Sequence, residues 1–365
     1  MTRYRPTWAE IDLGAIRHNA GVLRPAEGAL MAVVKADGYG HGAAEVAGAA
    51  LAGGASWVGV ALVEEGMSLR DAGIDVPILV TSELPPGAEA IAIAARLTPV
   101  LYSDGGLERL AAAARGSSIA VHVKVDTGMH RVGVWPPEAT PDFVRRVAAA
   151  GLDVEGLWTH FASSEEDAVT TVAQLDRFLA TVDAVRATGI EPRLLHAANS
   201  AATILHPSSR LDIVRPGIAL YGIAPARGIG GDLGLRPALT WRSRVSFAKR
   251  LEAGERLSYN HRYHLERDAW VATVPVGYAD GLPRSATGAP VLLGGARRPI
   301  AGNVTMDQIL VDCGEHEPAT GDDVTLIGTQ GDVTIGAWDL AEAAGTIPYE
   351  IVARLGARVD REHVG

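Results

Sequence analysis

The sequence has 365 residues, of which 47% are hydrophobic and 21% are charged, and its formal net charge at pH 7 is -10. This length predicts about two domains and at least one sizeable core. The acidic balance argues against nucleic acid as a partner, because neutralising phosphates requires a surplus of Lys and Arg. No uninterrupted apolar run approaches the roughly 18 residues that a membrane span needs. We therefore expect neither nucleic-acid nor membrane binding.

The chain begins MTRYRPTWAEID, without the apolar core of a secretory signal ahead of its first acidic residues. This pattern predicts a cytoplasmic protein. The single cysteine, Cys313, lies in the apolar run ILVDCG, which predicts a buried strand and an unreactive thiol. We expect no metal.

Between about residues 29 and 222, short β-branched runs alternate with longer Ala-rich segments of helical period. Eight such runs occur: ALMAVVKA from Ala29, WVGVAL from Trp57, PILVTS from Pro77, TPVLYS from Thr98, SIAVHVKVD from Ser118, VEGLWTHF from Val154, RLLHAAN from Arg193 and LDIVRPG from Leu211. Helices are expected in AAEVAGAALAG after Gly42 and in VAQLDRFLATVDAVRATG after Thr171. Eight βα units in series predict a closed (β/α)8 barrel of the TIM type. A doubly wound open sheet is the alternative.

Beyond about Leu235 the sequence pattern changes to β-branched segments separated by glycine turns, which predicts a mostly β domain. The glycine-rich stretch between Arg227 and Pro237 is the expected boundary, and we divide the chain into a barrel over residues 1–232 and a β domain over residues 233–365. Residues 1–12 have strand character and could pair with the second domain.

Barrel enzymes assemble their chemistry at the carboxyl ends of the strands. Lys35 closes the first run, and Tyr39 and His41 follow it on a glycine-bearing loop. A lysine in a partly apolar mouth has a lowered pKa and is a better nucleophile for a carbonyl, which indicates Schiff-base chemistry. The alternative is that Lys35 is an ordinary solvated charge.

The later runs also end in polar residues. His160 ends the sixth run, Asn199 and Ser200 follow the seventh, and Arg215 ends the eighth. Ser200 and the backbone NH groups of Gly217 and Ile218 could hold a small phosphate, while Arg131, after the fifth run, suits a carboxylate or a phenolate. The alternatives are a core histidine at His160, a helix cap at Ser200 and a surface ion pair at Arg131.

Eight segments occur in the order found in bacterial alanine racemases, which are pyridoxal-phosphate enzymes of fold type III. They are VVKADGYGHG, KVDTGMHRVG, WTHFASSEE, HAANSAA, DIVRPGIALYG, VPVGYADGLPR, GNVTMDQ and PYEIVARLGARV. The resemblance runs from Ala9 to Arg361. It implies a barrel that binds pyridoxal 5'-phosphate, a C-terminal β domain and a head-to-tail homodimer with shared active sites.

The resemblance also implies roles for individual residues. Lys35 resembles the lysine that forms an imine with the cofactor and acts as one catalytic base, and Tyr259, in RLSYNHRY, resembles the second base, which is donated across the dimer. Arg215 resembles the arginine facing the pyridine nitrogen. The remaining cofactor contacts that it implies are Tyr39, Arg131, His160, Asn199, Ser200, Gly217, Ile218 and Tyr349.

For the substrate, the resemblance implies that Arg131, Met306 and Asp307 seat the carboxylate and that Tyr278 narrows the entrance. Lys124 matches a position that is a carbamylated lysine in some relatives, although a simple interaction with Asp126 is an alternative. Three positions depart from the family pattern. Many relatives have glycine instead of Asn260 and cysteine instead of Thr305, and glycine or asparagine is frequent instead of His130.

This resemblance predicts racemisation of alanine through the cofactor imine, with Lys35 and the partner's Tyr259 acting on opposite faces of the substrate and D-alanine supplied for peptidoglycan. The alternatives are a racemase for serine or for a broader range of amino acids, and a decarboxylase of the same fold. A decarboxylase would want an acid where this chain has Arg215. A carrier of the cofactor without turnover would lack the second domain.

Overall fold

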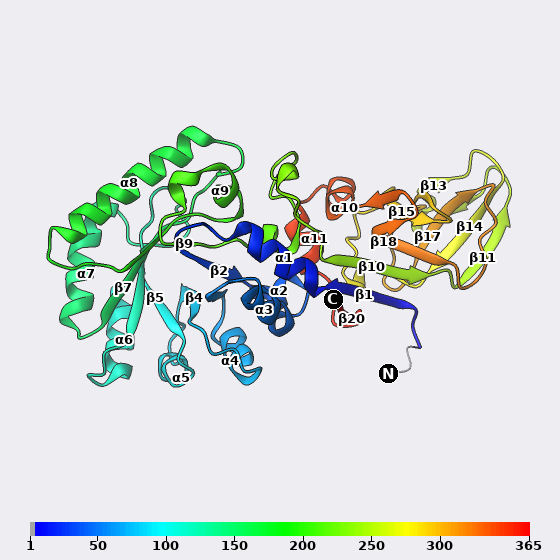
Figure 1. The fold of residues 1–365 in the computed structure, drawn as a ribbon. Helices are drawn as coiled ribbons and strands as arrows, with labels where there is room; N and C mark the ends of the chain where they lie inside the picture. Colours follow the sequence, from blue (N-terminus) through cyan, green and yellow to red (C-terminus); the bar gives the residue numbers. More distant parts are fainter. Residues whose placement is uncertain (1–3) are drawn as a thin grey trace. The chain divides into compact units, whose positions relative to one another are not determined.

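The computed structural model describes residues 4–365, which form two compact units (Figure 1). The barrel unit comprises Gly14–Gly38 and Ala43–Arg236, and the β unit comprises the described residues up to Leu13, Tyr39–Gly42 and Pro237–Gly365. The chain thus passes into the β unit after Arg236, a few residues beyond the expected boundary. The short segment Tyr39–Gly42 belongs to the β unit although it follows the first barrel strand. Residues 1–3 of the expected N-terminal strand segment lie outside the described residues.

The eight expected runs are all parallel strands of one sheet, in the order β8-β7-β6-β5-β4-β3-β2-β9. Their bounds are β2 Ala29–Val33, β3 Trp57–Val60, β4 Ile78–Glu83, β5 Thr98–Leu101, β6 Ala120–Lys124, β7 Asp153–Trp158, β8 Leu194–His196 and β9 Ile213–Val214. Backbone hydrogen bonds from Asp212 N to Leu195 O and from Arg215 N to Ala198 O, both 3.0 Å, link β8 to β9. The (β/α)8 barrel is therefore confirmed, and the open-sheet alternative is wrong.

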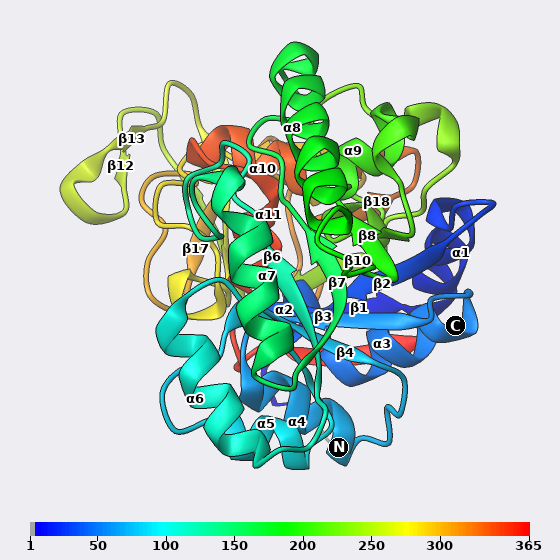
Figure 2. The ribbon, with the colours of Figure 1, turned by 90° about the vertical axis from the view of Figure 1, so that its left-hand side faces the viewer.

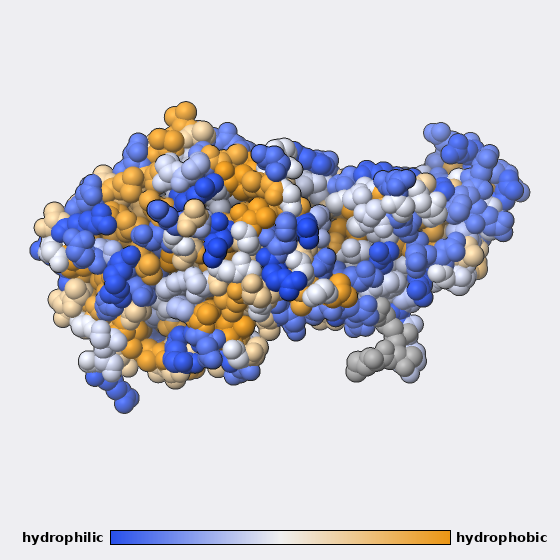
Figure 3. Space-filling model, in the orientation of Figure 1, coloured by the Kyte–Doolittle hydropathy of each residue, from blue (hydrophilic) through white to orange (hydrophobic). Residues whose placement is uncertain are grey.

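Helices surround these strands (Figure 2). They are α1 Leu13–Leu23, α3 Ala43–Ala52, α4 Val63–Asp71, α5 Glu89–Ala94, α6 Asp104–Ala114, α7 Thr140–Ala149, α8 Ala168–Arg186 and α9 Ser200–Leu205. The short segment labelled α2, Lys35–Tyr39, has non-helical φ and ψ angles at its centre. Helix α8 begins earlier than the sequence suggested, because the Asp167 side chain caps it by accepting a hydrogen bond from the Thr170 amide. It buries Leu175, Phe178 and Val182 and exposes Val169. Hydrophobic residues also reach the surface over the barrel unit (Figure 3).

The interior of the barrel is filled by large apolar side chains from six of its strands. They are Met31, Trp57, Leu79, Val100, Trp158 and Ile213. The two other strands, β6 and β8, contribute His122 and His196, which are fully buried. The barrel is a packed core, as expected for this fold, but two of its eight strands bury an imidazole there.

The β unit is built on a sheet in the order β16-β15-β18-β10-β1-β20, with β19 paired to β18, beside a three-stranded sheet β11-β14-β17 and the hairpin β12-β13. Strand β1 pairs antiparallel with β10 and parallel with β20. The bounds are β1 Thr7–Asp12, β10 Leu239–Arg244, β11 Phe247–Leu251, β12 Arg256–Leu257, β13 Tyr263–His264, β14 Ala269–Val274, β15 Pro290–Leu293, β16 Ala296–Pro299, β17 Ile309–Gly314, β18 Asp323–Gln330, β19 Val333–Ile335, α10 Ala337–Ala344, α11 Pro348–Ala353 and β20 Asp360–Val364. The mostly β second domain is confirmed.

Cys313 lies on β17 and is fully buried, as its apolar run predicted. Burial raises the pKa of its thiol to about 11, so it is protonated and unreactive near neutral pH. Among the helices of residues 4–365, none has the length and apolar character needed to cross a membrane.

Candidate active site

Lys35 stands at the end of β2 and begins a turn of unusual handedness. The four residues after it have positive φ: Ala36 53°, Asp37 52°, Gly38 61° and Tyr39 52°. Non-glycine residues rarely adopt this conformation. Two carboxylates stabilise it, because Glu65 Oε1 accepts from the Ala36 amide at 2.6 Å and Asp37 Oδ1 accepts from the Ala43 amide at 3.0 Å. The turn holds Lys35 at the barrel mouth and leads the chain into Tyr39–Gly42.

Four cationic side chains act on one another at the carboxyl ends of the barrel strands: Lys35, Lys124, Arg131 and Arg215. Burial lowers the pKa of Lys35, and the charge of Arg131 lowers it further. Burial lowers the pKa of Lys124 to about 7, with Arg131 and Arg215 adding to the shift. Burial also lowers the pKa of Arg215 to about 9. A mouth with this excess of positive charge is suited to an anionic ligand.

Lys124 lies on β6 with its Nζ 4.5 Å from the centre of the Trp158 ring. The charge of Asp126 acts on Lys124 and raises its pKa, against the larger effect of burial, although the described residues show no ion pair within 4 Å between the two. Instead, Asp126 Oδ1 accepts from the amides of Gly128 and His130, both at 3.0 Å, and shapes the loop that carries Arg131. Arg131 is exposed and makes no ion pair with any residue that the structure describes. Its guanidinium is therefore free to meet a ligand.

Arg215 is buried just beyond β9. Its Nη2 donates to Thr159 O at 2.8 Å and to Ala197 O at 3.0 Å, and lies 3.4 Å from His160 Nδ1. Its Nη1 lies 3.0 Å from His196 Nδ1. Burial and the surrounding cations, Arg215 first, hold the pKa of His160 well below its ordinary value. His160 is therefore neutral at physiological pH and lies next to the Arg215 guanidinium.

Ser200, Gly217 and Ile218 meet after β8 and β9. The Ser200 Oγ accepts from the Gly217 amide at 2.9 Å and from the Ala219 amide at 3.3 Å. Ile218 opens a 3₁₀ helix, Ile218–Tyr221, so its amide has no partner within that helix. The helix cap is Asn199 and not Ser200, because Asn199 Oδ1 accepts from the Ala202 amide at 2.9 Å. The Ser200 hydroxyl thus faces the amides of the next loop.

In the β unit, the rings of Tyr39 and Tyr349 lie side by side, with centroids 6.3 Å apart. Gly40 allows this approach, because a Cβ at Gly40 would lie 2.2 Å from Val352 O of α11. The Arg361 Nε donates to Gly40 O at 3.1 Å and fixes the segment. Burial raises the pKa of Tyr39 to about 12, so its phenol is neutral near neutral pH. Two phenols are presented together, one from each of two distant segments.

Tyr259 opens a 3₁₀ helix, Tyr259–His261, and its side chain is 70% exposed. The side-chain Nδ2 of Asn303 donates to Tyr259 O at 2.9 Å, and the Ser258 Oγ donates to Asn303 O at 2.9 Å. These reciprocal bonds hold the turn. A hollow of about 490 Å³ lies beside it, lined by Ser258, Tyr259, Asn260, His261, Thr305, Gln308, Ile309 and Leu310.

Tyr278 and Met306 lie together, because the Tyr278 amide donates to Thr305 O and the Ala279 amide donates to Met306 O, both at 3.0 Å. The Met306 amide has no acceptor among the described residues and is available to a ligand. The Asp307 carboxylate instead pairs with Arg358 at 2.8 Å. Any contact of Asp307 with a substrate carboxylate would therefore come from its backbone.

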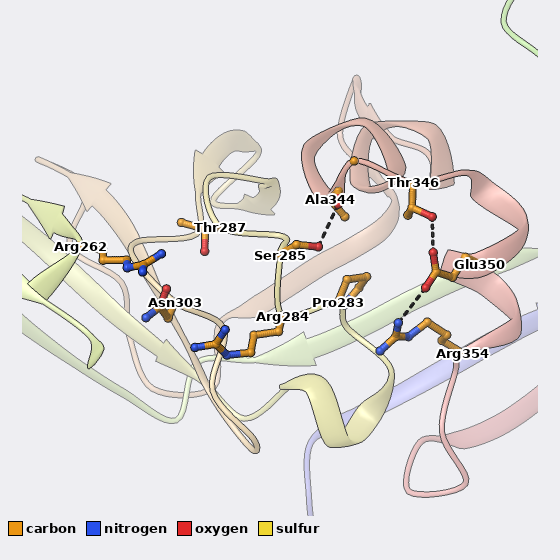
Figure 4. A pocket seen from close by; sticks show the side chains of 11 residues that line it. Arg262, Pro283, Arg284, Ser285, Thr287, Asn303, Ala344, Thr346, Glu350 and Arg354 are labelled. Atoms are coloured by element: carbon orange, nitrogen blue, oxygen red, sulfur yellow. Dashed lines mark hydrogen bonds and ion pairs between the residues drawn. The ribbon is translucent and has the colours of Figure 1, made fainter. Parts of the chain in front are cut away.

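Another pocket of the β unit, about 680 Å³ in volume, contains none of the expected site residues (Figure 4). It is lined by Arg262, Pro283, Arg284, Ser285, Thr287, Asn303, Ala344, Gly345, Thr346, Glu350 and Arg354. Glu350 pairs with Arg354 at 2.8 Å. The guanidinium groups of Arg262 and Arg284 lie on either side of Asn303 in this view.

The structure explains two of the three departures from the family pattern. His130 has φ 55° and Asn260 has φ 62°, so both positions favour glycine or asparagine. His130 offsets part of this cost by packing edge-on against the Trp135 ring at 4.6 Å. Thr305 uses its hydroxyl to donate to Gln308 O at 2.7 Å, which closes its own turn.

Sequence reasoning missed His122 and His196. The signal was present, because His122 lies two residues before Lys124 in the run SIAVHVKVD, and alternate residues of a strand face the same side. His196 likewise lies within an expected strand run, RLLHAAN. The structure puts both inside the barrel, where His122 Nδ1 lies 2.8 Å from His196 Nε2.

The fold and these residues define a two-domain barrel enzyme with a cationic site at the carboxyl ends of its strands. Two family models match the chain: "Alanine racemase, N-terminal domain" over residues 11–225 and "Alanine racemase, C-terminal domain" over residues 238–363. The chain is 46% identical to an alanine racemase of Frankia casuarinae over 98% of this chain and 96% of the relative. It is also 46% identical to one of Symbiobacterium thermophilum, over 99% and 98%.

Solved structures agree with these comparisons. The alanine racemase from D-cycloserine producing Streptomyces lavendulae superposes with a TM-score of 0.94 at 39% identity, covering 100% of this chain and 98% of that one. The Bacillus anthracis enzyme with bound L-Ala-P has a TM-score of 0.94 at 36% identity, covering 100% and 96%. The chain belongs to the alanine racemase family. It is an isomerase that interconverts L- and D-alanine, and the decarboxylase and carrier alternatives are wrong.

Proposed function

We propose that this racemisation depends on pyridoxal 5'-phosphate bound at the barrel mouth. The observation that carries the proposal is the cluster of four basic side chains, Lys35, Lys124, Arg131 and Arg215, because the cofactor brings a phenolate and a phosphate and the substrate brings a carboxylate. When bound, the cofactor supplies an electron sink that makes the substrate's α-proton removable.

The side chains and backbone amides of the candidate site fit pyridoxal 5'-phosphate. Lys35 offers an amine whose pKa is lowered by burial and by Arg131, so a larger fraction of it is the neutral nucleophile that adds to an aldehyde. For the phosphate, we assign the Ser200 hydroxyl, the amides of Gly217 and Ile218, and the phenols of Tyr39 and Tyr349. Asn199 directly precedes Ser200 and caps the helix that begins there. A neutral Tyr39 donates a hydrogen bond without adding a negative charge beside the phosphate.

Arg215 acts on the pyridine nitrogen. A guanidinium offers only N–H donors and keeps its protons, so Arg215 would donate a hydrogen bond to the pyridine nitrogen without protonating it. This limits the electron sink and disfavours decarboxylation and transamination. Arg131 would contact the phenolate and the substrate carboxylate, and the Met306 amide and the backbone of Asp307 would bind the same carboxylate. Tyr278 narrows the entrance beside them.

Two bases exchange the α-proton. The Nζ of Lys35 takes or returns it on one face of Cα, and the phenol oxygen of the partner's Tyr259 does so on the other. His160 links Arg215 to that tyrosine. This assignment requires a homodimer with shared active sites. The D-alanine formed would serve peptidoglycan synthesis, and a cytoplasmic location stays a prediction.

Lys124 is proposed to carry a carbamate. With a pKa of about 7, a large part of its amine is neutral at physiological pH and can add to the carbon of CO2, losing one proton to solvent. The anion formed would pair with Arg131, which has no carboxylate partner among the described residues. It would also orient that guanidinium toward the ligand.

Reduction with borohydride tests the role of Lys35. The sequence contains three lysines, Lys35, Lys124 and Lys249, so peptide mapping of the reduced holoenzyme identifies the attachment point without ambiguity. We expect the pyridoxyl label on Lys35. A label on Lys124 or Lys249, or protein that never acquires near-visible absorbance after reconstitution, overturns the proposal.

Mixed dimers test the shared site. Lys35→Ala and Tyr259→Phe each disable every site of their own homodimer. In a mixed dimer one site combines an intact Lys35 with an intact Tyr259 from the other protomer, so random mixing should restore about one quarter of the wild-type rate. Recovery of no activity by a verified mixed dimer would place both bases on the same chain.

A further inference from the structure

Two imidazoles are buried in the barrel core where the other strands place apolar side chains. His122 lies on β6 and His196 on β8, and both have no exposed surface. His122 contacts the Trp57 ring at 5.4 Å, and the Trp158 ring stacks on His196 at 5.5 Å with an interplanar angle of 5°. Burying an imidazole in apolar surroundings is costly unless its nitrogens are hydrogen-bonded.

The two imidazoles form the middle of a continuous file. His122 Nδ1 lies 2.8 Å from His196 Nε2, and His196 Nδ1 lies 3.0 Å from Arg215 Nη1. At the other end, His122 Nε2 lies 3.5 Å from Glu155 Oε2, near the start of β7. The file therefore connects a carboxylate near the amino end of one barrel strand to the arginine beyond the carboxyl end of another.

The chemistry of the file determines where its protons lie. Arg215 can only donate, so His196 Nδ1 must accept and His196 Nε2 must carry the proton. That proton is donated to His122 Nδ1, which leaves the His122 proton on Nε2, directed at the Glu155 carboxylate. Burial lowers the pKa of both histidines, which keeps them neutral. The two tautomers thus follow from one guanidinium, and His122 Nε2 faces the Glu155 carboxylate at 3.5 Å as an ion-pair contact without forming a hydrogen bond.

The file also limits how Arg215 can turn. The two Nη2 protons go to Thr159 O and Ala197 O, with His160 Nδ1 a third, longer contact at 3.4 Å, and one Nη1 proton goes to His196. Of the five guanidinium protons, one on Nη1 and the one on Nε are left for a ligand. If His196 carried its proton on Nδ1, two N–H groups would oppose each other, and the guanidinium would have to rotate.

We propose that Glu155, His122 and His196 are positioning residues, which orient Arg215 and share its charge through two neutral imidazoles of fixed tautomer. The orientation itself rests on the geometry of the barrel unit. Its consequence for racemisation rests on the proposed role of Arg215 toward the pyridine nitrogen.

The tautomers are tested by two-bond ¹⁵N–¹H correlation spectra of histidine-labelled holoenzyme at neutral pH, with His122→Phe and His196→Phe used for assignment. We expect both imidazoles to be neutral, with the proton on Nε2. A proton on Nδ1 of either histidine, or an imidazolium, overturns the proposal whatever the cofactor does. This measurement does not depend on turnover.

The coupling of Glu155 to His196 and Arg215 is tested with Glu155→Gln against a matched control, Asp153→Asn. Both carboxylates lie on β7 and pair with Arg193, at 3.4 Å and 2.8 Å, but among the ion pairs of the described residues only Glu155 reaches His122. We expect Glu155→Gln to shift the His196 nitrogen resonances and to lower kcat about tenfold with KM within twofold, while Asp153→Asn does neither.

Glu155→Asp keeps the charge and should recover part of both effects, which separates positioning from folding. If Glu155→Gln leaves the His196 resonances and kcat as in Asp153→Asn, the file is structural only and the proposal fails. If the resonances shift as expected but no cofactor binds, the proposed function fails and the positioning of Arg215 stands.

Discussion

The Nζ of Lys124 lies 4.5 Å from the centre of the Trp158 ring, inside the barrel and with 3% of the residue exposed. Burial and neighbouring cations lower its pKa from 10.5 to about 7. Between these values the unfolded chain holds a proton that the folded protein has released, so this lysine makes stability rise with pH from about 7 to 10.5. The slope from one such group reaches about 1.4 kcal/mol per pH unit.

Lys124→Met should therefore flatten the pH dependence of stability over this range. Melting temperatures at pH 7 and pH 9.5 in CO2-depleted buffer would show a smaller gain at high pH than in the wild type. Lys249 is exposed on β11, so Lys249→Met is the matched control and should retain the wild-type dependence. Equal pH dependence in Lys124→Met and the wild type would mean that Lys124 is not a buried neutral amine.

Gly40→Ala should destabilise the β unit strongly. Its φ is 81°, and its Cβ would lie 2.2 Å from Val352 O, so the change adds a backbone clash to conformational strain. Gly73 has φ 82° with nothing within 4 Å of a Cβ, which makes Gly73→Ala a control for strain alone. We expect a loss of about 1 kcal/mol for Gly73→Ala and of at least about 3 kcal/mol for Gly40→Ala by chemical denaturation. Equal losses would show that the close approach is absent.

Asn260 is exposed next to Tyr259 and has φ 62°. Asn260→Gly should change stability by less than about 0.5 kcal/mol, whereas Asn260→Val should cost about 1–2 kcal/mol, because a β-branched residue tolerates this conformation poorly. The valine variant should also lower kcat by displacing the turn. If valine and glycine proved equally stable in urea unfolding, the left-handed conformation would be ruled out.

Asn303→Asp should release the Tyr259 turn. The substitution keeps the size of the side chain but replaces the amide that donates to Tyr259 O by a carboxylate that cannot. We expect a loss of about 1–3 kcal/mol in stability and about a tenfold drop in kcat. Gln308→Glu makes the same chemical change at an exposed position that lines the hollow beside Tyr259 and should have little effect on either. An unchanged kcat in Asn303→Asp would show that Tyr259 does not need this bond.

The barrel could be predicted because each strand is buried on both faces and reads as a continuous apolar run. Lys35, His160 and Arg215 could be placed at the mouth because they end such runs. The start of α8 was misplaced, since its signal was the single cap Asp167 and not the apolar period. Local patterns of this kind require no knowledge of distant residues.

Other features depend on residues that meet only in the folded chain. Tyr39–Gly42 joins the β unit because Gly40 fits against Val352, which nothing near Gly40 in the sequence indicates. Asp307 pairs with Arg358, which leaves its backbone and not its carboxylate for a ligand. His122 and His196 looked like ordinary strand residues until the barrel brought their nitrogens within 2.8 Å.

The amino-acid sequence by itself determined the order of the βα units, the β-rich second part and the chemical groups available at the strand ends, because periodicity and burial are properties of neighbouring residues. The tertiary structure alone decided which nitrogens face each other, which amides stay unpartnered and which amines lose their protons. Hydrogen bonding and desolvation depend on atoms contributed by segments that are far apart along the chain.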